Sequence, residues 1–123
     1  MSSILIKKAT IIDPNSAHNN TIKDVLIENG IITSIGNKIT PKNKKTKCFE
    51  EDNLHICPGL MDFSVDFGEP GNEQKETLDS GCKAAIAGGF TAVGLQPTSE
   101  PPRDNKSAIH FCINSVVNNG INI

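Results

Sequence analysis

The chain has 123 residues, of which 37% are hydrophobic, 21% charged and only 4% aromatic, and its formal net charge is −2. This length suits one ordinary domain with a modest core, and the composition is that of a globular protein. The slight negative charge and the few aromatic side chains argue against a nucleic-acid-binding protein, and the short apolar runs argue against a membrane-spanning one. The N-terminal residues also lack an apolar stretch of signal-peptide length, so we expect a cytoplasmic protein.

The cysteine spacing favours neither a zinc ribbon nor a disulfide framework. The four cysteines are Cys48, Cys57, Cys82 and Cys112, and no two of them form a C-x-x-C pair. A chain without a secretion signal also has little use for disulfides. We therefore expect four buried or half-buried thiols.

The first 57 residues have the pattern of short β-strands. Apolar, β-branched stretches lie at residues 4–6, 9–12, 24–28, 31–35, 46–50 and 54–57. Asn29-Gly30 predicts a hairpin between the third and fourth stretches, because both residues tolerate a positive φ. The last two stretches are expected to form a further strand pair. We interpret the whole segment as an antiparallel β unit.

After Pro58-Gly59, predicted strands alternate with predicted helices. Strands are expected at residues 60–67 and 90–95, helices at 75–87 and 106–117, and the start of a third strand at 121–123. Asn105 is expected to cap the second helix, Gly88-Gly89 to end the first, and residues 118–120 to end the second. This alternation predicts an α/β unit with buried parallel strands and right-handed crossovers.

So few elements bury little apolar surface, because a parallel strand needs neighbours and a cover on each face. The sequence stops inside the third predicted strand. We therefore expect a truncated chain. The alternative is a short edge strand in a small complete domain.

Residues 58–101 read PGLMDFSVDFGEPGNEQKETLDSGCKAAIAGGFTAVGLQPTSEP. This stretch resembles the dihydroorotases and their close relatives in the amidohydrolase superfamily, the allantoinases and hydantoinases. Their pattern is P-G-L/I-I/M-D-x-H-x-H-x-R-E-P-G, followed by a K-E helix, a G-G-F/V-T turn and a strand that ends in M-P-N. The turn at Ile12–Pro14 and the hairpin at Val25–Gly36 also resemble the N-terminal segment of the family.

The resemblance implies a (β/α)8 barrel of the TIM type flanked by a small β-sandwich. Residues 1–57 would then be a sandwich segment, and residues 58–123 the first units of an incomplete barrel. The family reaction is the reversible hydrolysis of a cyclic amide by a zinc-activated hydroxide. In such barrels the reacting groups lie at the carboxyl ends of the strands.

The resemblance also shows where this chain departs from the family. Ser64 and Asp66 replace the two zinc-binding histidines. Gly68 and Thr98 replace the arginine and the asparagine that contact the substrate carboxylate in the family. A serine hydroxyl is a poor zinc ligand, so Asp66 remains the one candidate metal ligand. We expect no catalytic residue and no cofactor in this chain, although the family uses zinc.

Other polar side chains offer little replacement chemistry. His18, His55 and His110 are expected to be structural or solvated rather than metal ligands. Asp62 is expected to fix backbone hydrogen bonds. Arg103 and its neighbour Asp104 are expected to be solvated loop charges.

Three functions remain open. The first is an inactive homologue, a pseudoenzyme with a structural or assembly role in pyrimidine biosynthesis, as in family members that accompany aspartate transcarbamoylase. The second is an active zinc-dependent hydrolase of dihydroorotate, hydantoin or allantoin, in which Asp66 and later ligands hold the metal. The third is a remnant without independent function, whose unpaired strand edges lead to self-association. Neither a nucleic acid nor a membrane is expected as a partner.

Overall fold

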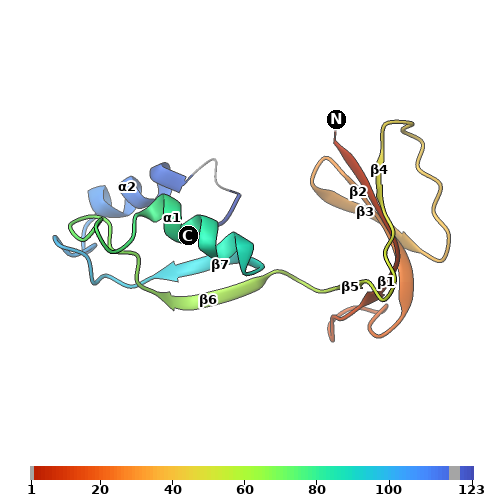
Figure 1. The fold of residues 1–123 in the computed structure, drawn as a ribbon, viewed down its shortest axis with the longest axis horizontal. Coiled ribbons are helices and arrows are strands. Elements are labelled where there is room, and N and C mark those ends of the chain that lie inside the picture. Colours follow the sequence, from red (N-terminus) through yellow and green to blue (C-terminus); the bar gives the residue numbers. More distant parts are fainter. Residues whose placement is uncertain (1, 117–119) are drawn as a thin grey trace. The chain divides into compact units, whose positions relative to one another are not determined.

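The structure is a computed structural model that describes residues 2–116 and 120–123. The chain divides into two compact units, Met1–Pro58 and Gly59–Ile123, called unit 1 and unit 2 below (Figure 1). Each unit has its own sheet. In the described residues, no helix is both long enough and apolar enough to cross a membrane.

Unit 1 is a mixed sheet of five strands. The strands are β1 (Ser3–Ile11), β2 (Ile22–Glu28), β3 (Ile31–Gly36), β4 (Lys47–Phe49) and β5 (His55–Ile56). The order is β3-β2-β1-β4, and β5 also pairs with β1. β1, β2 and β3 are antiparallel neighbours, whereas β4 and β5 run parallel to β1 (Figure 1).

The expectation of a purely antiparallel segment, with the last two strands paired to each other, is therefore wrong. Residues 37–46 return the chain to the end of the sheet where β1 starts, so both later strands run beside β1 in its own direction. β4 pairs with the first half of β1 and β5 with its second half, as the partners Leu5–Cys48 and Ile11–Ile56 show. Each short strand thus extends the same edge.

The hairpin at Asn29-Gly30 is confirmed. Glu28 pairs directly with Ile31, so the turn has two residues. Asn29 has a φ of 53° and Gly30 a φ of 81°, which places both in the left-handed region. Such a turn matches the right-handed twist of the two strands that it joins.

The buried carboxylate of Asp24 organises one edge of unit 1. Its side chain is only 6% exposed and accepts hydrogen bonds from the backbone N–H groups of Lys8, at 3.0 Å, and Ile39, at 2.9 Å. Lys8 lies in a β-bulge of β1 and has a φ of 51°. The carboxylate therefore satisfies donors that the bulge and the following loop leave unpaired.

Unit 2 alternates strands and helices as expected. Its elements are β6 (Leu60–Val65), α1 (Leu78–Ala87), β7 (Phe90–Leu95) and α2 (Lys106–Val116). β6 and β7 are parallel. Asn122 continues the parallel pairing, because its N–H bonds the carbonyl of Thr91 and its carbonyl accepts from Val93 N, at 3.0 and 2.9 Å. Residues 121–123 thus join β7 as the sequence pattern predicts.

Polar caps set the starts of both helices. Thr77 Oγ1 accepts from Ser80 N at 3.1 Å, so α1 begins at Leu78 rather than at residue 75. Asn105 Oδ1 accepts from Ala108 N at 3.0 Å, which confirms Asn105 as the cap of α2. Gly88 ends α1 as expected.

The expected end of α2 at residue 117, and residues 118–119 of its stop signal, lie outside the described residues. The described helix reaches Val116.

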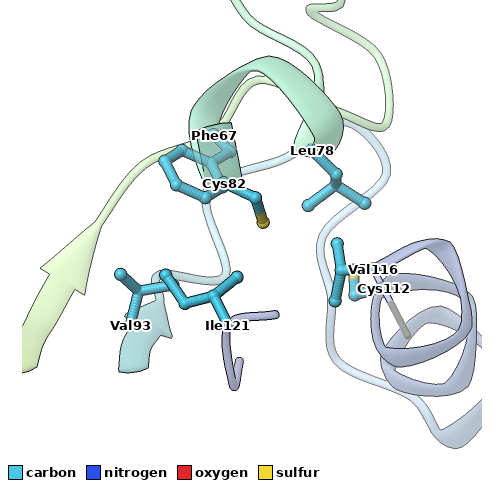
Figure 2. Packing of buried hydrophobic residues seen from close by; sticks show 7 residues of the cluster. All are labelled: Phe67, Leu78, Cys82, Val93, Cys112, Val116 and Ile121. Carbon is cyan, nitrogen blue, oxygen red and sulfur yellow. The ribbon is translucent and has the colours of Figure 1, made fainter. Parts of the chain in front are cut away.

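The core of unit 2 lies between the helices and one face of the strands. Figure 2 shows its buried members, which are Phe67, Leu78, Cys82, Val93, Cys112, Val116 and Ile121. α1 and α2 both lie on one side of β6 and β7 (Figure 1). The expected burial of β6 is therefore wrong for three of its apolar side chains, because Leu60, Met61 and Phe63 are 49%, 56% and 74% exposed.

The thiols differ between the two units. Cys82 and Cys112 are buried in unit 2, whereas Cys48 and Cys57 are exposed in unit 1. The expectation that all four are buried or half-buried is thus wrong for unit 1, whose short edge strand β4 leaves Cys48 uncovered. Burial raises the pKa of the Cys82 thiol, and the charges of Asp79 and Glu76 raise it further.

Alkylation should separate these thiols. We expect iodoacetamide at pH 8 to modify two cysteines of the native protein, Cys48 and Cys57, and all four in urea. The reason is that the thiolate reacts, and both access and thiolate formation are suppressed in the core. Intact mass and peptide mapping measure the adducts, and rapid labelling of Cys82 in the native protein would contradict the described packing.

Candidate functional site

The four family positions lie around the carboxyl ends of two adjacent parallel strands. Ser64 is in β6, Asp66 follows its last residue, and Gly68 lies in the next loop. Thr98 lies three residues beyond the end of β7. Because β6 and β7 are parallel neighbours, the loops after them start at the same edge of the sheet.

Two of these residues are brought into direct contact. Thr98 Oγ1 donates a hydrogen bond to Asp66 Oδ1 at 2.5 Å. A hydrogen bond to an ionised carboxylate is stronger than one between neutral groups. One oxygen of the candidate metal ligand is therefore already engaged by the neighbouring loop.

Ser64 is held by a backbone contact. Its N–H donates to Asp62 Oδ1 at 2.9 Å, and Ser64 itself is exposed. The same contact gives Asp62 the hydrogen-bonding role that the sequence predicts. The register between β6 and β7 shifts between Asp62 and Val65, so Ser64 lies in an irregular part of the strand.

Gly68 lies where a side chain does not fit. Asn72 N donates to the carbonyl of Gly68 at 2.8 Å, which folds the loop into a turn. A Cβ at position 68 would lie 2.3 Å from the carbonyl oxygen of Asn72, which belongs to the backbone. This loop conformation therefore excludes the arginine found at this position in the family pattern.

Arg103 is buried, and the expectation of a solvated loop charge is wrong. Its side chain donates to the backbone carbonyls of Phe67 and Glu69, each at 2.5 Å, and also to that of Gln96. The residue is 8% exposed, and its Nε lacks a hydrogen-bond partner in the structure. Arginine suits this position, because its planar fork carries several donors in fixed directions.

Glu69 also acts as an anchor. Its Oε2 accepts from Leu78 N at 2.8 Å, at the first residue of α1. A carboxylate at a helix N-terminus satisfies an unpaired donor and complements the helix dipole. The family pattern has a glutamate at this position, but a pattern along the chain does not indicate its partner.

The described residues do not fit a zinc ion. Protein zinc sites use three or four nitrogen, sulfur or oxygen ligands. Here the two family ligand positions offer only the carboxylate of Asp66 and the hydroxyl of Ser64. His18 and His55 belong to unit 1 and His110 to α2, and within residues 2–116 and 120–123 no three His, Cys, Asp or Glu side chains gather closely enough to bind a metal.

Solved structures define the fold class to which this arrangement belongs. The L-hydantoinase (dihydropyrimidinase) from Arthrobacter aurescens superposes with a TM-score of 0.70 at 17% identity, over 93% of this chain and 25% of its own. Molinate hydrolase gives a TM-score of 0.65 at 18% identity, over 99% of this chain and 29% of its own. The chain thus has the fold of a part of these larger hydrolases.

Sequence comparison gives the family. A family model described as Dihydro-orotase-like matches residues 54–120, so the chain belongs to the dihydroorotase-like family. The dihydroorotase of Trichlorobacter lovleyi is 36% identical over 118 residues, which are 96% of this chain and 27% of the relative. The dihydroorotase of Elusimicrobium minutum is 42% identical over 103 residues, which are 84% of this chain and 23% of the relative. The chain therefore spans about a quarter of the length of these relatives.

Proposed function

We propose that this chain is a catalytically inactive dihydroorotase homologue with a structural role. Unit 1 would be its sandwich segment and unit 2 the first strands and helices of its barrel. The observation that carries the proposal is the contact between Thr98 and Asp66, because it joins two altered family positions to each other. An oxygen that a metal would need serves a loop contact instead.

The surroundings of Gly68 support the same proposal. The loss of a substrate-binding arginine by mutation alone would leave room for its side chain. Here the backbone of Asn72 occupies that room, 2.3 Å from where a Cβ would stand. The loop conformation therefore requires a glycine at position 68. Such a loop is expected of a site that no longer binds the substrate carboxylate.

Metal content and turnover test this proposal together. We expect the purified full chain, after dialysis against buffer with micromolar zinc, to hold zinc far below one ion per chain. We also expect no hydrolysis of dihydroorotate, hydantoin or allantoin above the buffer rate. Elemental analysis and the absorbance of the ring substrates measure the two quantities.

An Asp66→Ala variant is the matched control for these measurements. We expect its zinc content and its turnover to equal those of the parent. Stoichiometric zinc or turnover that Asp66→Ala abolishes would overturn the proposal and favour the second function, a hydrolase with an altered metal shell.

The proposed role is the assembly of a larger complex in pyrimidine biosynthesis, with aspartate transcarbamoylase or a second copy as the partner. Leu60, Met61 and Phe63 of β6 are exposed, and exposed apolar surface of this kind supports an interaction site on unit 2. Light scattering of the chain, alone and mixed with the transcarbamoylase, measures both associations. A monomer in both samples would contradict this role.

A further inference from the structure

Two loops meet at the carboxyl ends of β6 and β7. They are residues 66–72, called loop A, and residues 96–104, called loop B. Glu100 N donates to the carbonyl of Pro70 at 3.1 Å. A Cβ on Gly71, whose φ is +98°, would lie 1.9 Å from the carbonyl oxygen of Glu100. The two backbones therefore touch, with no side chain between them.

Arg103 in loop B binds both loops. Its guanidinium donates to Phe67 and Glu69 in loop A and to Gln96 at the start of loop B. Arg103 is the single arginine of the chain. Three carbonyls from two loops on one planar group fix the separation of the loops in a way that the ammonium group of lysine cannot reproduce.

The Asp66–Thr98 contact is exposed and lies beside this bonded frame. Phe67, which Arg103 binds, directly follows Asp66, and Gln96 lies two residues before Thr98. Arg103 thus fixes the backbone beside both partners of the side-chain hydrogen bond. Burial of the charged Arg103 side chain costs solvation, and its three carbonyl partners offset that cost.

We propose that Arg103 and the Asp66–Thr98 hydrogen bond form a latch that holds loops A and B together beside the altered site. Arg103 is the positioning residue, and it acts on Asp66 and Thr98 through the backbone. Asp66, at a metal-ligand position of the family pattern, and Thr98, at a substrate-contact position, thereby hold the two loops together. This inference rests on the proposed loss of the metal site.

Amide hydrogen exchange of the full chain tests the latch. The reporter is Glu100 N, which bonds across the loops, and the reference is Val93 N, which bonds Asn122 in the sheet. We expect Thr98→Val and Arg103→Lys each to speed exchange at Glu100 by about tenfold, since hydrogen bonds to charged groups are involved. Exchange at Val93 should stay within about twofold of the parent, because local opening leaves the sheet intact.

Thr98→Ser is the conservative variant. Because it keeps the hydroxyl group, we expect amide exchange at Glu100 to proceed at the parental rate. Lys83→Met is the surface control, because Lys83 and its partner Asp79 both have exposed side chains on α1 and belong to neither loop. The two latch substitutions should also be non-additive, since each opens the same junction. If Arg103→Lys does not fold, the difference in Glu100 exchange rate between Thr98→Val and Thr98→Ser tests the latch by itself.

Unchanged exchange at Glu100 in Thr98→Val, or an equal rise at Glu100 and Val93, would overturn the latch. Either result would leave the inactive assignment standing, because that assignment is tested by zinc content and turnover. Stoichiometric zinc would overturn the inactive assignment whatever the exchange rates show.

Discussion

Replacing Gly68 by alanine is expected to lower the free energy of unfolding of unit 2 by about 2–3 kcal/mol. The new Cβ would lie 2.3 Å from the carbonyl oxygen of Asn72, and a backbone oxygen cannot rotate away as a side chain can. Either the turn from Gly68 to Asn72 opens, or loop A moves away from loop B. Both changes remove hydrogen bonds that the described structure contains.

The measurement should report on unit 2 alone. Alkylation of Cys82 and Cys112 at increasing urea concentration does so, because both thiols lie in the core of that unit. The midpoint of their exposure should fall for Gly68→Ala. Global spectroscopic signals would mix two units that need not unfold together.

Gly88→Ala is the matched control in the same unit. Gly88 has a φ of −81°, which alanine adopts without strain, and its new Cβ would be nearest to a ring carbon of Phe90, at 3.3 Å. That ring can shift by a few tenths of an ångström, so we expect a change within about 1 kcal/mol. Equal midpoints for the two variants would show that loop A is not built around the glycine.

The crowding at Gly68 also bears on the history of the site. The return of two histidines at positions 64 and 66 would supply imidazoles, but an arginine at position 68 would meet the backbone of Asn72. The departure at position 68 therefore depends on the backbone course of loop A. Point substitutions at the motif positions are not expected to rebuild a working site.

Local signals in the sequence predicted much of the fold. The pair Asn29-Gly30 predicted a two-residue turn, because its φ preferences suit that turn alone. Asn105 predicted the start of α2 for a similarly local reason, since its side chain reaches an N–H three residues away. Such signals depend on neighbours along the chain, which a sequence displays directly.

Contacts between distant residues were not predictable in this way. β4 and β5 look like an antiparallel pair in sequence, but both pair with β1, more than 40 residues earlier. Arg103 looks solvated beside its prolines, yet its partners in loop A lie 34 and 36 residues before it. Nothing in its immediate sequence neighbours indicates a cluster of free carbonyl groups. The sequence therefore predicted a solvent-exposed side chain for Arg103.

The candidate site falls between these cases. The motif identified Asp66 and Thr98 as separate positions, each of which differs from the family pattern. Their contact depends on the parallel register of β6 and β7 and on the course of two loops. A pattern read along the chain names such residues without bringing them together.

The second large effect is expected in the core, from Leu78→Ala. Leu78 is 1% exposed, and it packs with Cys82 and Cys112 between the two helices (Figure 2). Truncation removes buried methyl groups and leaves a cavity, so we expect a loss of about 3 kcal/mol. Leu60→Ala makes the same chemical change at a side chain that is 49% exposed, and we expect about 1 kcal/mol or less.

Leu78 also connects the core to loop A, because its own N–H bonds Glu69. A cavity under the first turn of α1 should therefore loosen that contact as well as the helix packing. We expect Leu78→Ala to make Cys82 accessible to alkylation at a lower urea concentration than Leu60→Ala does. We also expect faster amide hydrogen exchange at residue 78 in Leu78→Ala than in Leu60→Ala. Parental protection of Cys82 in Leu78→Ala would mean that the helices are held in place by something other than this cluster. Protection lost at Cys82 but kept at the amide of residue 78 would place the anchor of α1 in Glu69 alone.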